Sequence, residues 1–198
     1  MTAQVPVSKR QRNPGERAGL TYTAVVAAAR AALEQRGLPG LSMRAVAQAL
    51  GVAPNALYSH VDGKSGLLDA VLDDLIGEIP LPHEATPPRD ALEAIMLASF
   101  DALVQHPDLV AVSLARQGSG GPSARRLGSA MLERFAELGV AEKAAADGLR
   151  VLLVHLMGCA AFATQYDRTI GARQVHEVQA VRADYSTGLG WLLDGILS

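Results

Sequence analysis

Residues 42–64 of the chain read SMRAVAQALGVAPNALYSHVDGK, and they predict two short helices separated by a tight turn. Ser42 can cap the first helix because its hydroxyl can accept a hydrogen bond from a free backbone N–H of the first turn. Gly51 ends that helix, and Pro54 begins the second at a position where its missing N–H costs nothing. Two short helices joined through residues 51–53 have the spacing of a helix-turn-helix, whose second helix lies in the major groove of DNA.

The second helix of this pair carries polar side chains that suit contacts with DNA. Asn55 and Ser59 are small hydrogen-bonding groups that fit base edges, whereas Tyr58, His60 and Lys64 are longer donors that fit phosphate oxygens. With the residues around the first helix, the predicted DNA-binding set is Ser42, Arg44, Pro54, Asn55, Tyr58, Ser59, His60 and Lys64.

Residues 45–71, AVAQALGVAPNALYSHVDGKSGLLDAV, resemble the DNA-binding motif of the tetracycline-repressor (TetR) family. The combination LYxHVxxK followed by LLDA is the most specific part, and the resemblance covers about the first third of the chain. It implies a transcriptional regulator that binds a palindromic operator as a homodimer. Because members of this family usually repress transcription, a repressor is expected. The resemblance also implies release of the operator when a small ligand enters a second, larger helical lobe.

Composition predicts an all-α protein, because Ala, Leu, Arg and Glu recur whereas aromatic residues make up only 4% of the 198 residues. Residues 1–64 carry 8 Lys or Arg against 3 Asp or Glu, and residues 65–198 carry 10 against 17. This asymmetry draws the N-terminal part toward phosphates. Cys159 is the one cysteine, so no internal disulfide forms. No apolar run of membrane-spanning length and no signal peptide is evident, so a cytoplasmic protein without membrane partners is expected.

Three segments are predicted along the chain. Residues 1–19 form a flexible basic N-terminal arm. Residues 20–79 form a three-helix DNA-binding domain with a connecting fourth helix; its first helix begins at Thr21 or Thr23 and ends at Gly37. Four prolines between positions 80 and 88 then mark the start of an α-helical effector-binding and dimerisation domain, residues 80–198.

Two helices near the C-terminus are predicted to pair with their copies in a second chain. A long helix over about residues 142–167 is apolar nearly all round and must be covered on both sides. The last helix repeats apolar residues at helical spacing, and its predicted dimer-interface residues are Val178, Val181, Tyr185, Leu189 and Leu192.

The TetR resemblance also implies an effector cavity among the fifth to eighth helices. The candidate lining residues, each of which could equally be ordinary core, are Met96, Phe100, Leu103, His106, Met131, Phe135, His155, Phe162, Gln165 and Tyr166. In tetracycline repressors a histidine matching His106 binds drug-chelated magnesium, and an acidic residue further on helps to hold the metal. Residues 160–162 are Ala-Ala-Phe at that place, which argues against metal-bound tetracycline. A largely apolar effector is expected because most of the candidate lining is Leu, Met and Phe.

Catalytic and cofactor motifs are weak in this sequence, so no enzyme activity, cofactor or metal is expected. Gly63-Lys64-Ser65 lacks the earlier glycine of a phosphate-binding loop, and His155 with Cys159 offers only two of the four ligands of a zinc site. Two alternatives are kept: a helical enzyme or carrier with an incidental basic N-terminus, and a scaffold that binds only proteins. Salt-dependent retention on duplex DNA separates the regulator from both, and turnover of a bound compound marks the enzyme.

Overall fold

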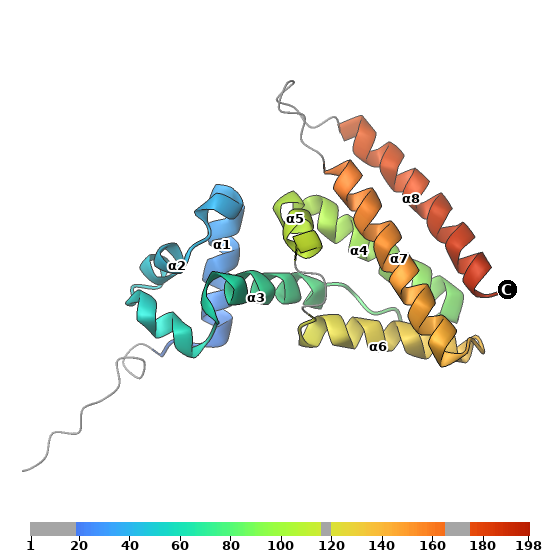
Figure 1. Cartoon of the computed structure of the whole chain (residues 1–198), viewed down its shortest axis with the longest axis horizontal. Helices are drawn as coiled ribbons and strands as arrows, with labels where there is room; N and C mark the ends of the chain where they lie inside the picture. Colours follow the sequence, from blue (N-terminus) through green and yellow to red (C-terminus); the bar gives the residue numbers. More distant parts are fainter. Residues whose placement is uncertain (1–18, 116–119, 165–174) are drawn as a thin grey trace, which may run out of the picture. The chain divides into compact units, whose positions relative to one another are not determined.

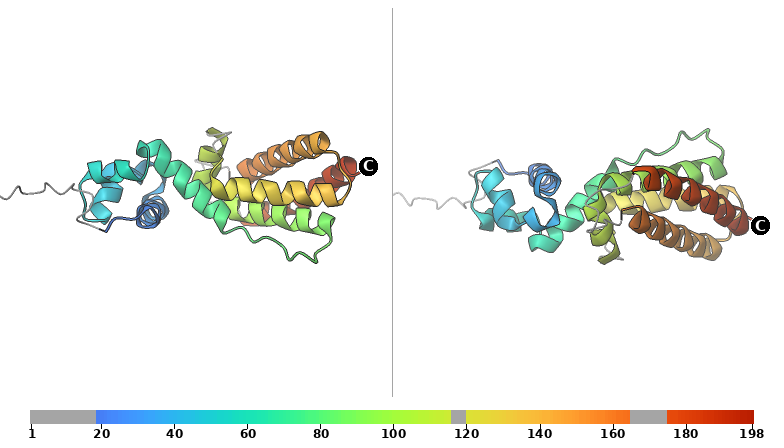
Figure 2. Two further views of the ribbon diagram at one scale, coloured as in Figure 1. Left: turned by 90° about the horizontal axis from the view of Figure 1, so that it is seen from below. Right: turned by 90° about the horizontal axis from the view of Figure 1, so that it is seen from above.

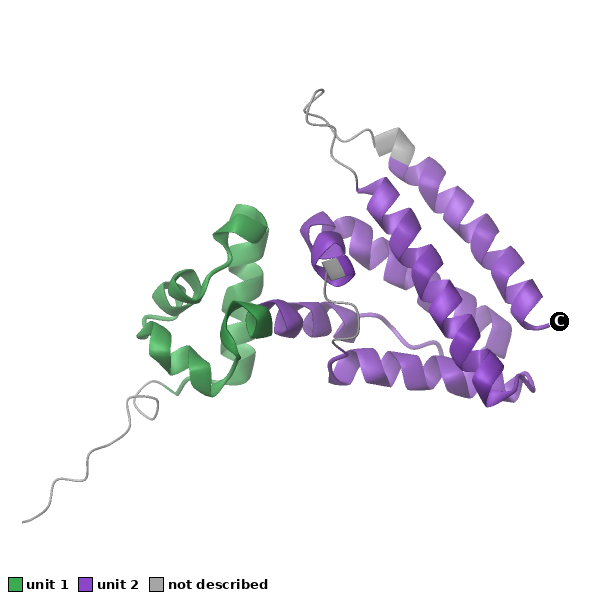
Figure 3. Cartoon of the chain, in the orientation of Figure 1, with its two compact units in different colours: residues 1–67 green, residues 68–198 purple. Residues whose placement is uncertain are grey.

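The computed structural model describes residues 19–115, 120–164 and 175–198, and these residues form helices and connections without a strand (Figure 1). The predicted all-α class is confirmed for this part of the chain. The basic arm at residues 1–19 falls almost wholly outside the described residues. The chain divides into two compact units, residues 1–67 and residues 68–198 (Figure 3).

The first unit contains α1 (Tyr22–Gly40), α2 (Met43–Ala49), the 3-10 helix η2 (Pro54–Ser59) and the start of α3 (Gly63–Gly77). Thr21 caps α1 as predicted, since its Oγ1 accepts a hydrogen bond from Ala24 N at 3.2 Å. Gly37 has a φ of 65° and non-helical backbone angles, so it interrupts the first helix where its end is predicted, and the bounds of α1 include a short helical piece beyond this kink. The apolar side of α1 is buried as expected, with Val25, Val26, Ala29 and Leu33 in the core.

The boundary between the units lies inside α3, whereas the sequence analysis grouped all of this helix with the DNA-binding domain. The second half of α3 joins the second unit through specific contacts. The Asp73 carboxylate accepts hydrogen bonds from the backbone N–H groups of Ser123 and Ala124, at 2.9 and 3.1 Å. A single helix therefore contributes to both units.

The second unit contains the remainder of α3 with α4 (Pro88–Gln105), α5 (Pro107–Ala115), α6 (Pro122–Glu137), α7 (Glu142–Ala163) and α8 (Val175–Ile196). Three of these helices begin at a proline, where the fixed φ suits the first turn and no N–H is wasted. Gly139 has a φ of 77° and follows α6, in agreement with the predicted end of that helix. Within the unit, α7 and α8 lie side by side in all views (Figures 1 and 2).

Large side chains from α4, α6 and α8 form the core of the second unit. Phe100 and Tyr185 are fully buried and stack with their ring centroids 4.7 Å apart. The Tyr185 hydroxyl donates a hydrogen bond to the backbone oxygen of Met96 at 3.1 Å. Burial raises the pKa of this phenol well above its usual range, so Tyr185 stays neutral. The stacked pair thus fixes α8 against α4.

The helix α7 is apolar on its outer side as well as on its core side. Among the described residues, α7 is the one unbroken helix that is long and apolar enough by composition to cross a membrane, with a mean hydropathy of 1.4. This differs from the expectation that no apolar run reaches such a length. Leu152 and Leu156 are buried in the core of the second unit, and a core helix can have the same composition. Val154 and Phe162 nevertheless remain 73% and 69% exposed, so the described residues leave part of this apolar helix uncovered.

Candidate functional site

The helices α2 and η2 form a compact pair in the first unit. The Ser42 hydroxyl accepts a hydrogen bond from Ala45 N at 3.2 Å, which confirms the predicted cap of α2. Gly51 has a φ of 64°, a conformation that favours glycine, and it lets the chain turn after α2. Pro54 begins η2, and Leu57 is fully buried. The sequence pattern predicts that this second helix ends near Val61, whereas in the structure it is a 3-10 helix that ends at Ser59.

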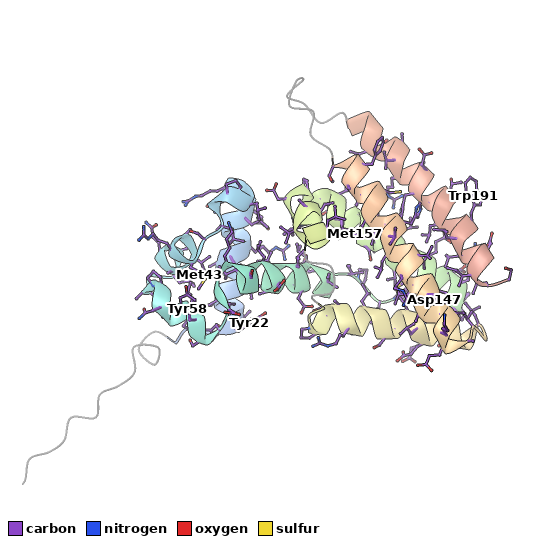
Figure 4. The ribbon with its side chains drawn as sticks, viewed as in Figure 1. Tyr22, Met43, Tyr58, Asp147, Met157 and Trp191 are labelled. Carbon is purple, nitrogen blue, oxygen red and sulfur yellow. The ribbon has the colours of Figure 1, made fainter. Side chains whose placement is uncertain are left out.

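The exposed side of η2 carries the residues that were expected to meet DNA. Asn55 and Ser59 are exposed, and Tyr58 is 62% exposed and labelled in Figure 4. The Ser59 hydroxyl donates to the backbone oxygen of Ala56 at 2.8 Å and keeps its oxygen available as an acceptor. His60 is half-buried at the end of η2. The exposed face of η2 is therefore polar and accessible, and the buried side chain of Leu57 anchors the opposite face of η2 in the core.

Lys64 and Arg44 add positive charge to the same unit. Both side chains are exposed, and each lies in the first turn of a helix, Arg44 in α2 and Lys64 in α3. A cation at this end opposes the helix dipole, so neither position favours helix stability. A helix N-terminus and a cation together suit a phosphate oxygen, because both present positive charge to it. Ser42 and Pro54 have other local functions as a cap and as the first residue of a helix.

The second unit contains a partly open cavity with a volume of about 250 Å³. Five helices and the residues that follow two of them line it, and its walls are almost entirely apolar. The lining residues are Leu72, Leu75, Ile76, Ile79, Ser99, Ala102, Leu103, His106, Leu109, Ser113, Ala124, Leu127, Gly128, Met131, Leu149, Leu153, Leu156 and Met157. None of them is Lys, Arg, Asp or Glu. This cavity can hold a small apolar molecule and offers it few polar partners.

Three of the predicted effector residues line this cavity: Leu103, His106 and Met131. The side chains of Met96, Phe100 and Phe135 lie in the core and do not line it. Phe162 is exposed on α7, while Gln165 and Tyr166 lie outside the described residues.

Residues from α3 and the middle of α7 complete the cavity, and the sequence pattern does not single them out. Leu72, Leu75 and Ile76 come from α3, and Leu149 with Leu153 comes from α7. The apolar spacing of α3 was a usable signal, because it continues beyond the segment that resembles the family motif. The spacing alone does not distinguish a cavity wall from packed core, so these residues could not be assigned to a site.

His155 belongs to a packed cluster between α7 and α8. Its Nε2 lies 3.2 Å from the backbone oxygen of Tyr185, and its ring stacks on that of Tyr185 with centroids 5.0 Å apart. The Cys159 sulfur lies 3.7 Å from His155 Nδ1, and burial raises the pKa of this thiol. Across the described part of the chain, no three His, Cys, Asp or Glu residues cluster as a metal site would require.

The apolar repeat predicted as a dimer interface lies mainly on the core side of α8. Tyr185 and Leu189 are fully buried within the chain and Val181 is nearly so, whereas Val178 and Leu192 are half-buried. Buried side chains leave no surface for a second chain to contact, so this expectation is corrected for those three residues. The large exposed side chain of α8 is that of Trp191, which is 74% exposed and projects at the edge of the unit in Figure 4.

Comparison with known proteins relates the helix-turn-helix to one family. Residues 25–71 match the model of "Bacterial regulatory proteins, tetR family". An "HTH-type transcriptional regulator" of Saccharopolyspora erythraea is 38% identical over 102 residues, which are 51% of this chain and 43% of the relative. The "HTH-type transcriptional repressor DrrR1" of Streptomyces coeruleorubidus is 38% identical over 117 residues, 58% of this chain and 43% of the relative. These matches thus span less than half the length of either curated relative.

Solved structures extend the likeness to both units. SCO7222, described as a TetR from Streptomyces coelicolor, is 26% identical, with a TM-score of 0.70, and the match covers 90% of this chain and 98% of that chain. BioQ with its natural double-stranded DNA operator matches with the same TM-score, identity and coverage.

A helix-turn-helix domain followed by a larger helical unit is the fold that this chain shares with solved transcriptional regulators. Residues 25–71 match the TetR family of bacterial regulatory proteins, and the fold of both units is similar to that of a solved TetR protein. The relatives are named as transcriptional regulators and not as enzymes, in agreement with the sequence analysis.

Proposed function

We propose that this chain is a homodimeric transcriptional repressor that binds a palindromic operator and releases it when a small, largely apolar effector enters the cavity of the second unit. The observation that carries the DNA-binding part is the exposed polar face of η2, with Asn55, Tyr58 and Ser59 held over the buried Leu57. The name of the relative DrrR1 and the operator complex of BioQ support the same function.

The contacts of this face divide into two kinds. Asn55 can form paired hydrogen bonds with an adenine edge, so it is the residue proposed to read a base. Lys64, Tyr58 and His60 suit phosphates, which fix position without reading sequence. Arg44 is proposed as a further DNA contact of either kind. This division matters because base contacts and phosphate contacts respond differently to substitution.

Binding of duplex DNA as a function of salt tests the proposal. Lys64→Ala should weaken binding to all sequences alike and reduce the salt slope by about one unit, because one phosphate contact is lost. Asn55→Ala should relax preference at one base pair, at a cost of about 1–3 kcal/mol. Fluorescence anisotropy of labelled duplexes measures both effects.

The control for the charge change is Lys143→Ala, which removes an exposed lysine of the second unit that pairs with Asp147 at 2.8 Å. This variant should bind DNA as the unchanged protein does. Loss of base preference in Lys64→Ala, or an equal effect of Lys143→Ala, would contradict the proposed placement of the DNA contacts.

The cavity supports the effector part of the proposal, since four of its residues come from α3 or follow it directly, and α3 begins beside the DNA-binding face with Lys64 in its first turn. A ligand that fits best when α3 is displaced would change the position of the recognition helix. Linkage then requires operator DNA to weaken ligand binding by the same factor by which the ligand weakens operator binding, typically about 5- to 150-fold. Dimerisation is proposed through the exposed apolar sides of α7 and α8.

A further inference from the structure

One wall of the cavity contains a glycine in the middle of a helix. Gly128 lies in α6 (Pro122–Glu137) and lines the cavity. A Cβ atom added at Gly128 would meet no other atom within 4 Å. Glycine inside a helix makes the helix less stable than alanine would at the same position. The position therefore leaves open volume where an ordinary helix-forming residue would put a side chain.

Two other helical glycines in the same unit show the more usual reason for a glycine. A Cβ at Gly148 would lie 3.0 Å from a side-chain atom of Ile196, and a Cβ at Gly188 would lie 2.8 Å from the His155 ring. Both glycines allow two helices to approach closely. Gly128 has no such neighbour among the described residues, so close packing does not explain it, and unlike Gly158, Gly190 and Gly195, which also have none, it lines the cavity.

The chemistry of the walls restricts the charge of a ligand. Among the described residues, no Lys, Arg, Asp or Glu lines the cavity, and His106 is the one lining residue there with a titratable side chain. The Ser99 hydroxyl already donates a hydrogen bond to the backbone oxygen of Ile95 at 2.7 Å. An ionised ligand would lose much of its hydration here, and His106, Ser99 and Ser113 are the few polar side chains among the described lining residues that could replace it, which carries a penalty. A neutral molecule avoids that penalty.

We propose that the cavity selects uncharged, apolar ligands and that Gly128 sets the size of the largest ligand it accepts. This inference rests on the proposed role of the cavity as the effector site. It goes further by naming a class of ligand and a residue that determines specificity.

Two fluorescent probes with the same aromatic skeleton test the charge selection. N-phenyl-1-naphthylamine is neutral, whereas 8-anilinonaphthalene-1-sulfonate carries one added sulfonate. The full chain should bind the neutral probe at least about tenfold more tightly than the sulfonate, since the charged group would lose hydration against apolar walls. Equal affinities, tighter binding of the sulfonate, or no saturable binding of the neutral probe would overturn the proposal.

Matched variants of α6 locate the neutral probe and test the size limit. Gly128→Phe should weaken its binding at least about tenfold, because the new ring fills the cavity. Gly128→Ala should weaken it less, while its thermal unfolding temperature rises because alanine is the better helix former. The control is Ser129→Phe, which adds the same ring at the exposed next position and should bind the probe as the unchanged protein does.

Circular dichroism should show that both phenylalanine variants keep their helical content. If Gly128→Phe fails to fold, the smaller change in Gly128→Ala decides the matter, and unchanged probe binding in that variant would overturn the size assignment. Operator affinity, measured in the same samples, separates this inference from the proposed function. Selective binding of the neutral probe that Gly128→Phe abolishes, without any effect on operator affinity, would support the cavity assignment and contradict the regulatory coupling.

Discussion

Asp73 shows how one side chain can connect two helices. The helix α6 begins after Gly121, which has no side chain to cap it, and the Asp73 carboxylate of α3 accepts its first N–H groups instead. A side chain at Gly121 would collide with this carboxylate. A negative charge at a helix N-terminus also interacts favourably with the helix dipole. Asp73 therefore fixes one cavity wall, α3, against another, α6.

Replacement of Asp73 by alanine should lower the free energy of unfolding by about 1–2 kcal/mol, which is the usual cost of losing a helix cap. Asp73→Asn should cost less, because the amide oxygen still accepts a hydrogen bond although the charge is lost. Urea denaturation monitored by circular dichroism measures both values. Glu133→Ala, which removes the same charge from the exposed surface of α6, is the control. A similar loss of stability in the Asp73 and Glu133 variants would contradict the capping role.

At the scale of elements, α7 and α8 each have a buried face and an exposed apolar face. Val151, Val154, Gly158 and Phe162 follow one another at helical spacing along the exposed side of α7, and Trp191 is exposed on α8. Exposed side chains of this size gathered on adjacent helices are typical of a protein–protein contact. In a two-fold dimer the same patch serves both chains, which suits a second copy of this surface.

Introducing a charge into this patch should separate the dimer. Val154→Arg and Phe162→Arg should sediment as monomers at micromolar concentration and should bind operator DNA more weakly, although their helix-turn-helix is unchanged. The control is Glu142→Arg, which places the same charge in the exposed first turn of α7, outside the patch. Sedimentation of the unchanged protein as a monomer would contradict the proposed interface. Leu189→Arg does not give a clean test, since Leu189 is fully buried in the core of its own chain.

The sequence predicts the parts of this fold that depend on local chemistry. Thr21 and Ser42 cap helices, Gly51 takes a positive φ and Pro54 begins η2, because each residue acts on neighbouring backbone atoms only. The function of an apolar helix face is not local. Periodicity finds the faces of α7 and α8 but does not say which packs in the core, which lines a cavity and which stays exposed. For this reason the sequence pattern predicts Tyr185 in the dimer interface although it is buried, and it does not indicate that Leu72 lines the cavity.

At the scale of the whole molecule, the proposed regulator depends on symmetry. One recognition helix spans too few base pairs for a tight site, and two helices related by a dimer axis meet successive major grooves about 34–36 Å apart. The operator should therefore repeat the symmetry of the protein. Tight operator binding through the exposed face of η2 therefore requires dimerisation, which is proposed to use the exposed patch on α7 and α8. This holds whichever gene the operator controls.

Selection of bound duplexes from a random pool tests this central claim most directly. The full chain, incubated with the pool at moderate salt and separated on a gel, should enrich an inverted repeat whose half-sites are centred about one turn of the double helix apart. Asn55→Ala should enrich the same repeat with one position relaxed in each half-site. Enrichment of a single unrepeated motif, or of no motif at all, would contradict the account of this chain as a homodimeric operator-binding regulator.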